Sequence, residues 1–319
     1  MSRLGGNCDV TRNLRDGRRT LTLMTTPLLL DGSMGHEIVN RGGKSGYGEW
    51  GIDALHENPA IIGAIHREYI DAGADVITTN TYSVTRTRLR HVGIEDRLAE
   101  LAALGGQLAV EARTARARPD VQIAASIGPL EGSYINSFTL SYDEMVAEFS
   151  ELMTLLAPYV DIYLGETFST RIEAQAFLTA AQDQPKPIWV AVSLDDSAPA
   201  HLRGGETLVS ALATIAPFAP DAVLLNCCMP ESIDQQLTTL QRAGVPYGGY
   251  ANGFVKIPDN WQKDRDVVAQ IASRTDLSPA VYSQHAQNWL QAGASIVGGC
   301  CDIGPEHIAH LRQTLDAQA

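Results

Sequence analysis

The chain has 319 residues, of which 45% are hydrophobic and 19% are charged, as expected of a globular protein with a large core. Its formal net charge of −13 argues against a nucleic-acid binder, because phosphate recognition depends on clustered Lys and Arg. No apolar run is long enough to span a bilayer. We therefore expect a soluble, cytoplasmic protein that binds neither nucleic acid nor membranes, and the sequence gives no oligomeric state.

Residues 1–26 are predicted to be an extension that lies outside the folded domain. The segment is rich in Arg, has little periodicity and is too broken to be a secretory signal. Basic unstructured arms are common at chain ends. We expect residues 1–26 to be disordered and residues 27–319 to form a single domain.

The first clear helix-to-strand unit begins at Asn58. Asn58 followed by Pro59 is typical of a helix start, since Asn is a good N-cap and Pro suits the first helical position. The apolar stripe that follows stops at Gly73, and residues 75–79 then form a buried apolar run. The unit predicts a helix and then a strand.

The same order returns along the rest of the chain. Ser141 and Glu144 have the spacing of a capping box before the next helix. Eight apolar runs are predicted as strands, at residues 27–30, 75–79, 121–127, 161–164, 187–193, 222–226, 246–251 and 294–297. Helical patterns separate them, including residues 98–115, 172–181, 208–216, 232–241 and 279–291. Alternating strands and helices imply a parallel sheet with right-handed crossovers.

Eight regularly spaced units favour a closed (β/α)8 TIM barrel over an open doubly wound sheet. An open dinucleotide-binding sheet requires a Gly-rich phosphate turn after an early strand. The nearest candidate, Asp31-Gly32-Ser33-Met34-Gly35, does not have the G-x-G-x-x-G spacing. We predict an α/β fold with one (β/α)8 barrel.

Polar or reactive residues follow the predicted strands, where the active sites of such barrels are built. They are Asp31, Thr79, Asn80, Ser126, Glu166, Ser193, Cys227, Asn252, Cys300 and Cys301. Each has an ordinary alternative: Ser126 and Ser193 suit helix caps or turns, Asp31 suits a turn, and Glu166 suits the cap of a helix near Thr170. The collective pattern is what predicts a site.

The cysteines do not resemble a disulfide framework, because four of the five form two adjacent pairs, Cys227-Cys228 and Cys300-Cys301. These pairs end the sixth and eighth predicted strands and therefore open onto one rim. Gly298 and Gly299 suit a sharp backbone turn before the second pair. Buried free cysteines are common, but this arrangement favours a metal site.

The cysteines are compatible with two kinds of zinc site. A structural site needs a fourth protein ligand, for which Cys228, His285 and His307 are candidates, although the two histidines look like ordinary helix residues. Three thiolates and an open position are typical of a catalytic site. Such a site converts a substrate thiol to its thiolate, and a cationic methyl donor is attracted to the electron-rich sulfur.

At this point the chain resembles the homocysteine S-methyltransferase family, the zinc barrel of betaine-, S-methylmethionine- and cobalamin-dependent enzymes. The matching segments span residues 28–315 in the expected order. They are Asp31-Gly32-Ser33-Met34-Gly35, Ala72-Gly73-Ala74-Asp75, Thr79-Asn80-Thr81-Tyr82, Ser126-Ile127-Gly128-Pro129, Glu166-Thr167-Phe168, Asn226-Cys227 and Gly298-Gly299-Cys300-Cys301. Asn-Cys combined with the late Gly-Gly-Cys-Cys is the most specific part.

The resemblance implies a reaction and the residues that support it. It implies that Zn²⁺ is bound by Cys227, Cys300 and Cys301, with Cys227 preferred to Cys228 because the ligand directly follows Asn. It implies that Asp31 and Glu166 hold the ammonium group of homocysteine, and that Thr79 and the backbone amides near Gly32 hold its carboxylate. The expected reaction is methyl transfer from S-methylmethionine or S-adenosylmethionine to homocysteine, forming methionine.

The sequence specifies the methyl donor less closely than the methyl acceptor. Residues 42–53 and 250–254 depart from the family pattern, and Trp50 suits either a cationic donor pocket or ordinary packing. Betaine or another onium donor is one alternative. A non-catalytic barrel with a structural zinc site is the other.

Overall fold

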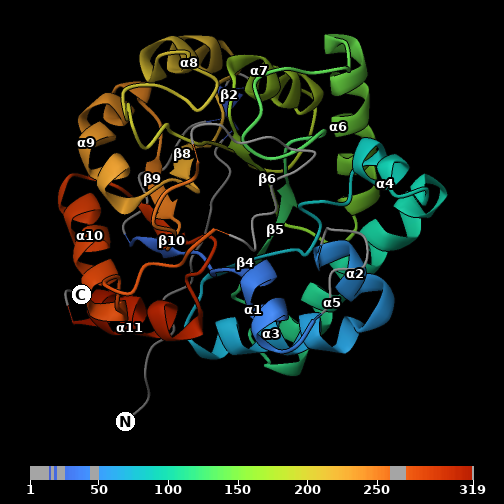
Figure 1. Ribbon diagram of the computed structural model, residues 1–319, viewed down its shortest axis with the longest axis horizontal. Helices are drawn as coiled ribbons and strands as arrows, with labels where there is room; N and C mark the ends of the chain where they lie inside the picture. Colours follow the sequence, from blue (N-terminus) through green and yellow to red (C-terminus); the bar gives the residue numbers. More distant parts are fainter. Residues whose placement is uncertain (1–13, 16–17, 20–25, 44–49, 259–270, 318–319) are drawn as a thin grey trace.

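A computed structural model describes residues 14–15, 18–19, 26–43, 50–258 and 271–317. Eight parallel strands form one sheet in the order β3-β10-β9-β8-β7-β6-β5-β4. A parallel bridge between Leu30 and Val76 joins the two edges, with Asp31 N donating to Val76 O at 2.9 Å. The sheet is thus a closed barrel, and helices surround it (Figure 1).

The barrel strands match the eight predicted runs. They are β3 (Leu28–Leu29), β4 (Val76–Thr78), β5 (Gln122–Ile127), β6 (Ile162–Phe168), β7 (Ile188–Val192), β8 (Ala222–Asn226), β9 (Tyr247–Ala251) and β10 (Ile296–Gly299). The predicted (β/α)8 TIM barrel is confirmed. The largest difference is β6, which continues past the predicted end at residue 164 to Phe168.

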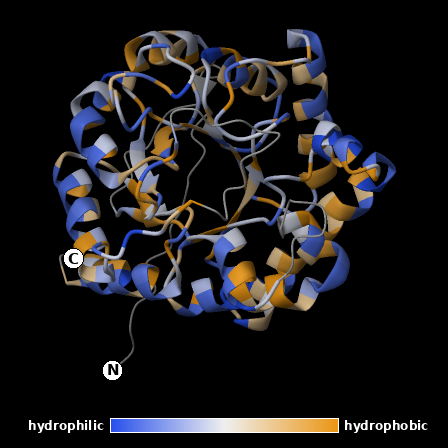
Figure 2. Cartoon of the chain, viewed as in Figure 1, coloured by the Kyte–Doolittle hydropathy of each residue, from blue (hydrophilic) through white to orange (hydrophobic). Residues whose placement is uncertain are grey.

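The helices also follow the predicted segments closely. They are α1 (Met34–Asn40), α2 (Trp50–Glu57), α3 (Pro59–Asp71), α4 (Arg86–His91), α5 (Leu98–Ala115), α6 (Tyr142–Leu156), α7 (Arg171–Ala180), α8 (Leu208–Ile215), α9 (Pro230–Leu240), α10 (Pro279–Gln291) and α11 (Pro305–Asp316). Their hydrophobic sides face the barrel and their hydrophilic sides face outward (Figure 2). None of the helices in the described ranges is long and apolar enough to cross a membrane.

Local sequence signals account for the ends of several helices. Ser141 and Glu144 form the predicted capping box before α6. Gly73 follows α3 with φ of 97°, a conformation that glycine adopts without strain. Asn58 is the N-cap of α3 as predicted, but its side chain makes no capping hydrogen bond. Pro59 at the first helical position is therefore the stronger of the two signals there.

Two layers of apolar side chains form the core. Residues that alternate along the strands fill the barrel interior, as Ile162 and Leu164 of β6 do. The intervening residues, such as Tyr163, pack against the surrounding helices. This alternation decides which residues at the strand ends point into the barrel.

The predicted N-terminal extension lies almost wholly outside the described residues. Within it, strands β1 (Leu14–Arg15) and β2 (Arg18–Arg19) pair with each other in antiparallel fashion. They take no part in the barrel sheet.

His66 of α3 is fully buried, and neither ring nitrogen has a hydrogen-bond partner in the described part of the chain. Burial lowers the pKa of His66 to about 3. In the unfolded chain, His66 binds a proton near pH 6.5. Protonation therefore stabilises the unfolded state increasingly as the pH falls below that value. Because of this residue, the free energy of unfolding therefore falls by up to about 1.4 kcal/mol for each pH unit.

We predict that His66→Leu reduces the acid sensitivity of the fold. Urea unfolding between about pH 7 and pH 5 should show a shallower loss of unfolding free energy in the variant than in the wild type. His91→Leu, at an exposed position, is the matched control and should keep the wild-type slope. Equal slopes for His66→Leu and the wild type would contradict the prediction.

Candidate functional site

Three cysteines meet at the carboxyl ends of the strands. Ligand atoms of Cys227, Cys300 and Cys301 all lie within 4.8 Å of one another, and Cys227 Sγ is 3.6 Å from Cys301 Sγ. Three sulfurs bound at about 2.3 Å in a tetrahedron lie about 3.8 Å apart, so the spacing fits a metal. No other His, Cys, Asp or Glu in the described ranges joins the group.

Strand β9 aligns these sulfurs. Cys227 N donates to Tyr250 O at 3.2 Å, and Cys300 N donates to Ala251 O at 2.9 Å. Adjacent carbonyl groups of one strand thus hold the chain on both sides. Cys227 itself takes a φ of 50°, which is strained for a residue with a Cβ.

The reason predicted for Gly298 and Gly299 is wrong, because neither has a positive φ. Both lie in extended strand β10, where neighbours approach closely. A Cβ on Gly298 would lie 2.4 Å from Leu30 Cβ, and one on Gly299 would lie 2.3 Å from a side-chain carbon of Ile303. Close packing at the barrel seam, and not a turn, explains the two glycines.

Within the cluster, the charged thiolate form is favoured at one cysteine. The pKa of Cys227 is held well below its usual range by hydrogen bonds from Cys300, which has the larger effect, and from Cys301. Donation to Cys227 in turn raises the pKa of both partners. Such a set of adjacent soft donors suits a thiophilic cation such as zinc.

Tyr134 lies against the cluster, and its hydroxyl is 3.0 Å from Cys227 Sγ. Burial raises the pKa of Tyr134 well above its usual value, so the hydroxyl stays protonated and donates to the sulfur. Buried Phe254 and Ile257 complete an apolar wall around Cys227. Sequence analysis missed Tyr134, which lies in a loop with no motif of its own.

Ser126, Glu166 and Tyr250 form a second group inside the barrel. Ser126 Oγ donates to Glu166 Oε1, and Tyr250 Oη donates to Glu166 Oε2 at 3.1 Å. Ser126 was weighed as a helix cap, but it continues the inward face of Ala124 in β5. The period of two along the strand is the signal that identifies it.

Glu166 does not cap α7, whose N-cap is Thr170 in a capping box with Glu173. Instead, β6 contains a register shift between Gly165 and Phe168, and Thr167 takes a φ of 62°. Asn226 fixes this bulge: its Oδ1 accepts from Thr167 N at 2.9 Å and its Nδ2 donates to Thr167 Oγ1 at 2.8 Å. The bulge leaves Glu166 pointing inward.

Asp31 is held at the end of β3 by the neighbouring strand. Thr78 N donates to Asp31 Oδ2 at 2.7 Å, and Thr78 Oγ1 donates to Asp31 Oδ1 at 3.1 Å. Gly32 follows, and a Cβ there would lie 2.1 Å from Ile303 O, so only glycine fits. Thr78 is a second site residue that sequence analysis missed, since the neighbouring Thr79 was preferred.

The two carboxyl groups are buried and lack a basic partner in the described ranges. Burial raises the pKa of Glu166 to about 7, although Ser126 and Tyr250 oppose the shift. Burial also raises the pKa of Asp31 well above its usual value, against the opposing bonds from Thr78. A cation placed between them would favour both charged forms.

The remaining predicted polar residues form hydrogen bonds within the chain. Asn80 Nδ2 donates to Gly51 O at 2.9 Å, Ser193 Oγ donates to Cys227 O at 3.2 Å, and Asn252 Oδ1 accepts from Phe254 N at 3.2 Å. The alternative zinc ligands lie outside the group. His285 pairs with Asp234 at 2.7 Å, and His307 contacts Leu277 O at 3.2 Å.

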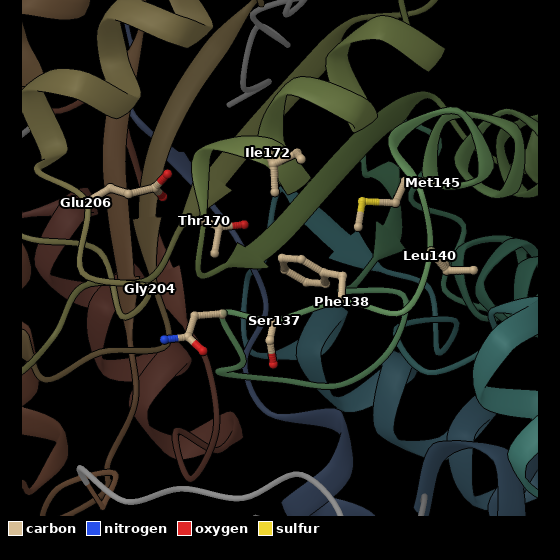
Figure 3. Close-up of a pocket in the computed structure, with 9 residues that line it drawn as sticks. Ser137, Phe138, Leu140, Met145, Thr170, Ile172, Gly204 and Glu206 are labelled. Carbon is tan, nitrogen blue, oxygen red and sulfur yellow. The ribbon is translucent and has the colours of Figure 1, made fainter.

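A cavity of about 400 Å³ opens on the same rim, between the loop after β5 and the loops after β6 and β7. Its apolar wall includes Phe138, Leu140, Met145 and Ile172, with Thr170 and Glu206 among its polar residues (Figure 3). None of the three cysteines lines it. Segment 44–49, within the stretch 42–53 that departs from the family pattern, lies outside the described residues, as does the side chain of Trp50, for which a donor pocket and ordinary packing were the alternatives.

Comparisons with known proteins agree on one family. The sequence profile described as "Homocysteine S-methyltransferase" matches residues 28–315. The chain is 30% identical over 309 residues to "Homocysteine S-methyltransferase" of Escherichia coli K12, covering 89% of this chain and 94% of that protein. It is 24% identical over 314 residues to "Homocysteine S-methyltransferase 3" of Zea mays, covering 91% and 90% of the two chains.

Solved structures give the same result. The metallated form of the homocysteine methyltransferase MmuM from Escherichia coli superposes with a TM-score of 0.76 at 25% identity. The match covers 91% of this chain and 97% of that one. The apo form of the same protein matches with a TM-score of 0.70.

We predict that the cysteine cluster binds about one thiophilic divalent ion per chain. Zinc titration, measured by equilibrium dialysis, should show that Cys227→Ala, Cys300→Ala and Cys301→Ala each weaken zinc binding by more than about 100-fold. That loss exceeds the usual cost of removing a residue that only orients a metal ligand. Cys228→Ala is the matched control, since Cys228 packs in the core between strands and helices. Loss of zinc in Cys228→Ala alone would contradict the assignment.

Proposed function

The chain belongs to the homocysteine S-methyltransferase family, and from this premise we propose that it transfers a methyl group from a sulfonium donor, S-methylmethionine or S-adenosylmethionine, to homocysteine, using zinc. The product is methionine. The observation that carries the proposal is the three-cysteine group with no fourth ligand among the described residues, beside two buried carboxyl groups. A structural zinc site would need that fourth ligand.

We assign zinc binding to Cys227, Cys300 and Cys301. When bound there, a zinc ion lowers the pKa of the substrate thiol, so that its sulfur is present as the nucleophilic thiolate at neutral pH. Tyr134 donates to Cys227 Sγ and, with Phe254 and Ile257, keeps the sulfurs in an apolar environment. Excluding water there protects the thiolate from losing its reactivity to solvation.

We assign the ammonium group of homocysteine to Glu166 and Asp31. Both carboxyl groups are buried, and Glu166 contributes to the raised pKa of Asp31 after the larger effect of burial. An ammonium group between them relieves this repulsion and supplies the missing counter-charge. Ser126, Tyr250 and Thr78 orient the oxygens that receive it.

We assign the carboxylate of homocysteine to the backbone amides near Gly32. Thr79 contributes by positioning, because its hydroxyl is 2.6 Å from Thr81 Oγ1 and accepts from Ser126 N at 3.1 Å. Thr81 donates its own hydrogen to Ser126 O, so the hydrogen between the two threonines belongs to Thr79. Thr79 thereby fixes Ser126, which in turn holds Glu166.

The reaction then requires little acid–base catalysis from side chains. The homocysteine sulfur attacks the methyl carbon, a new S–C bond forms, and the methyl–sulfonium bond breaks with its electron pair on the departing sulfur. The donor leaves as a neutral thioether, so it needs no proton. The proton of the acceptor thiol is released to solvent when the thiolate forms.

The proposal predicts a specific pattern of donor use. Zinc-loaded protein and homocysteine, offered S-methylmethionine, S-adenosylmethionine, betaine and dimethylsulfoniopropionate in parallel, should form methionine with S-methylmethionine or S-adenosylmethionine. Methionine formed with betaine alone would support the onium alternative. No methionine from any donor, with one zinc bound per chain, would overturn the proposed function.

A further inference from the structure

The loop after β7 carries two charged side chains, Arg203 and Asp196, that have no role in the proposed binding of zinc and homocysteine. Arg203 N donates to Ser193 O at 3.1 Å and Gly204 N donates to Ser169 O at 2.8 Å. Leu194 and Leu202 form an antiparallel bridge at the base of the loop. These backbone bonds fix Arg203 beside the ends of β6 and β7.

The guanidinium group of Arg203 lies over the ring of Tyr134, the residue whose hydroxyl contacts Cys227. The Cζ atom of Arg203 is 5.6 Å from the centre of that ring. Nη2 donates to Pro258 O at 3.1 Å. Nε and Nη1 are buried and have no partner in the described part of the chain. A guanidinium is always charged, and buried donors of this kind normally have an acceptor.

Asp196, in the same loop, is the acidic counterpart of Arg203. Its Oδ1 accepts from Met229 N at 2.8 Å and from Ser232 Oγ at 2.8 Å, at the start of α9. Its Oδ2 is buried and has no partner among the described residues. Burial raises the pKa of Asp196, and the charge of Arg203 is close enough to oppose that shift.

The two charges are neighbours but do not form an ion pair. Each head group keeps buried atoms without a partner, donors on Arg203 and an acceptor on Asp196. A ligand with both a carboxylate and an ammonium group on one carbon would satisfy both. A ligand with only one of these groups would leave the other side chain unpaired.

We infer that Arg203 and Asp196 bind the α-carboxylate and α-ammonium groups of an amino-acid sulfonium, and so select this class of methyl donor. The inference rests on the proposed function. The short carbon chain of such a donor lets its sulfonium lie near Tyr134, whose hydroxyl contacts Cys227, and an aromatic ring favours a cation. Betaine and dimethylsulfoniopropionate have a carboxylate but no N–H group for Asp196.

The rim cavity adjoins the loop that carries Arg203. Gly204, which follows Arg203, lines that cavity, as do Asn136 and Ser137, which lie just after Tyr134 in the chain. Arg203, Asp196 and Tyr134 are not among the residues that line the cavity, which lies next to the segments that carry them (Figure 3).

The test uses the zinc-loaded full chain and three donors: S-methylmethionine, its analogue with hydrogen in place of the carboxylate, and its analogue with hydrogen in place of the ammonium group. Arg203→Met should lower kcat/KM for S-methylmethionine by at least about tenfold, the cost of a hydrogen bond to a charged group, and leave the carboxylate-free analogue unchanged. Asp196→Asn, which keeps Oδ1, should lower kcat/KM for S-methylmethionine and leave the ammonium-free analogue unchanged. The KM for homocysteine and the zinc content should not change.

Matched controls come from neighbouring residues. Arg171→Met removes a surface arginine paired with Glu206 at 2.9 Å, and Asp195→Asn changes the residue next to Asp196. Both should behave as wild type with all three donors. Arg203→Lys keeps the charge without the planar fork and should fall between wild type and Arg203→Met, which separates recognition from misfolding.

Calorimetry separates this inference from the proposed function. S-Methylmethionine that binds the wild type at least about tenfold more tightly than Arg203→Met supports the inference even if no methionine forms, in which case only the proposed function fails. Equal losses for S-methylmethionine and the carboxylate-free analogue would overturn the inference. So would a change confined to the KM for homocysteine, or S-methylmethionine that does not bind the wild type.

Discussion

The site depends on strand β9, which holds Cys227 and Cys300 on either side of it through hydrogen bonds to the carbonyl groups of Tyr250 and Ala251. Cysteines far apart in the sequence become neighbours because the barrel is closed and its strands are parallel. The same closure places Asp31, at the end of β3, beside β10 and β4. Barrel geometry, more than any local motif, makes the site.

The buried carboxyl groups and cysteine sulfurs of the site explain what it attracts. Three sulfurs, Glu166 and Asp31 gather at one rim of a chain with a formal net charge of −13. The expected occupants are cationic or carry a cationic group: a metal ion, the ammonium group of homocysteine and a sulfonium methyl donor. Arg203 adds a positive charge beside Tyr134, and we infer that a carboxylate accompanying one of those cations pairs with it.

Sequence patterns predicted the barrel because each strand and helix has a strong local signal. The eight apolar runs and Ser141 of the capping box depend on nearby residues only, and the structure confirms them. The three cysteines also come together as predicted, since strand ends share one rim. The family profile confirms methyl transfer to homocysteine as the expected activity.

Other parts of the site depend on contacts between distant segments. The bulge at Thr167 forms through Asn226, which belongs to another strand, and no pattern in β6 alone predicts it. Gly298 is required by the approach of Leu30, a contact that exists only once the barrel closes. Tyr134 and Arg203 lie in loops, whose conformation depends on the elements they connect.

A finer rule would have found more of the site. Alternation along β5 and β4 places Ser126 and Thr78 on the inward face, and both contact the buried carboxyl groups. Selecting strand-end residues by sequence position alone favoured Thr79, whose hydroxyl bonds Thr81. The direction of the side chain therefore matters as much as its place at the end of a strand.

In the proposed site, the cysteine group leaves one metal position free for the sulfur of homocysteine. X-ray absorption at the zinc edge of the loaded protein tests it directly. The account predicts three sulfur ligands and one lighter ligand in the free protein, changing to four sulfur ligands when homocysteine is added. Four protein ligands that stay unchanged on addition of homocysteine would contradict it.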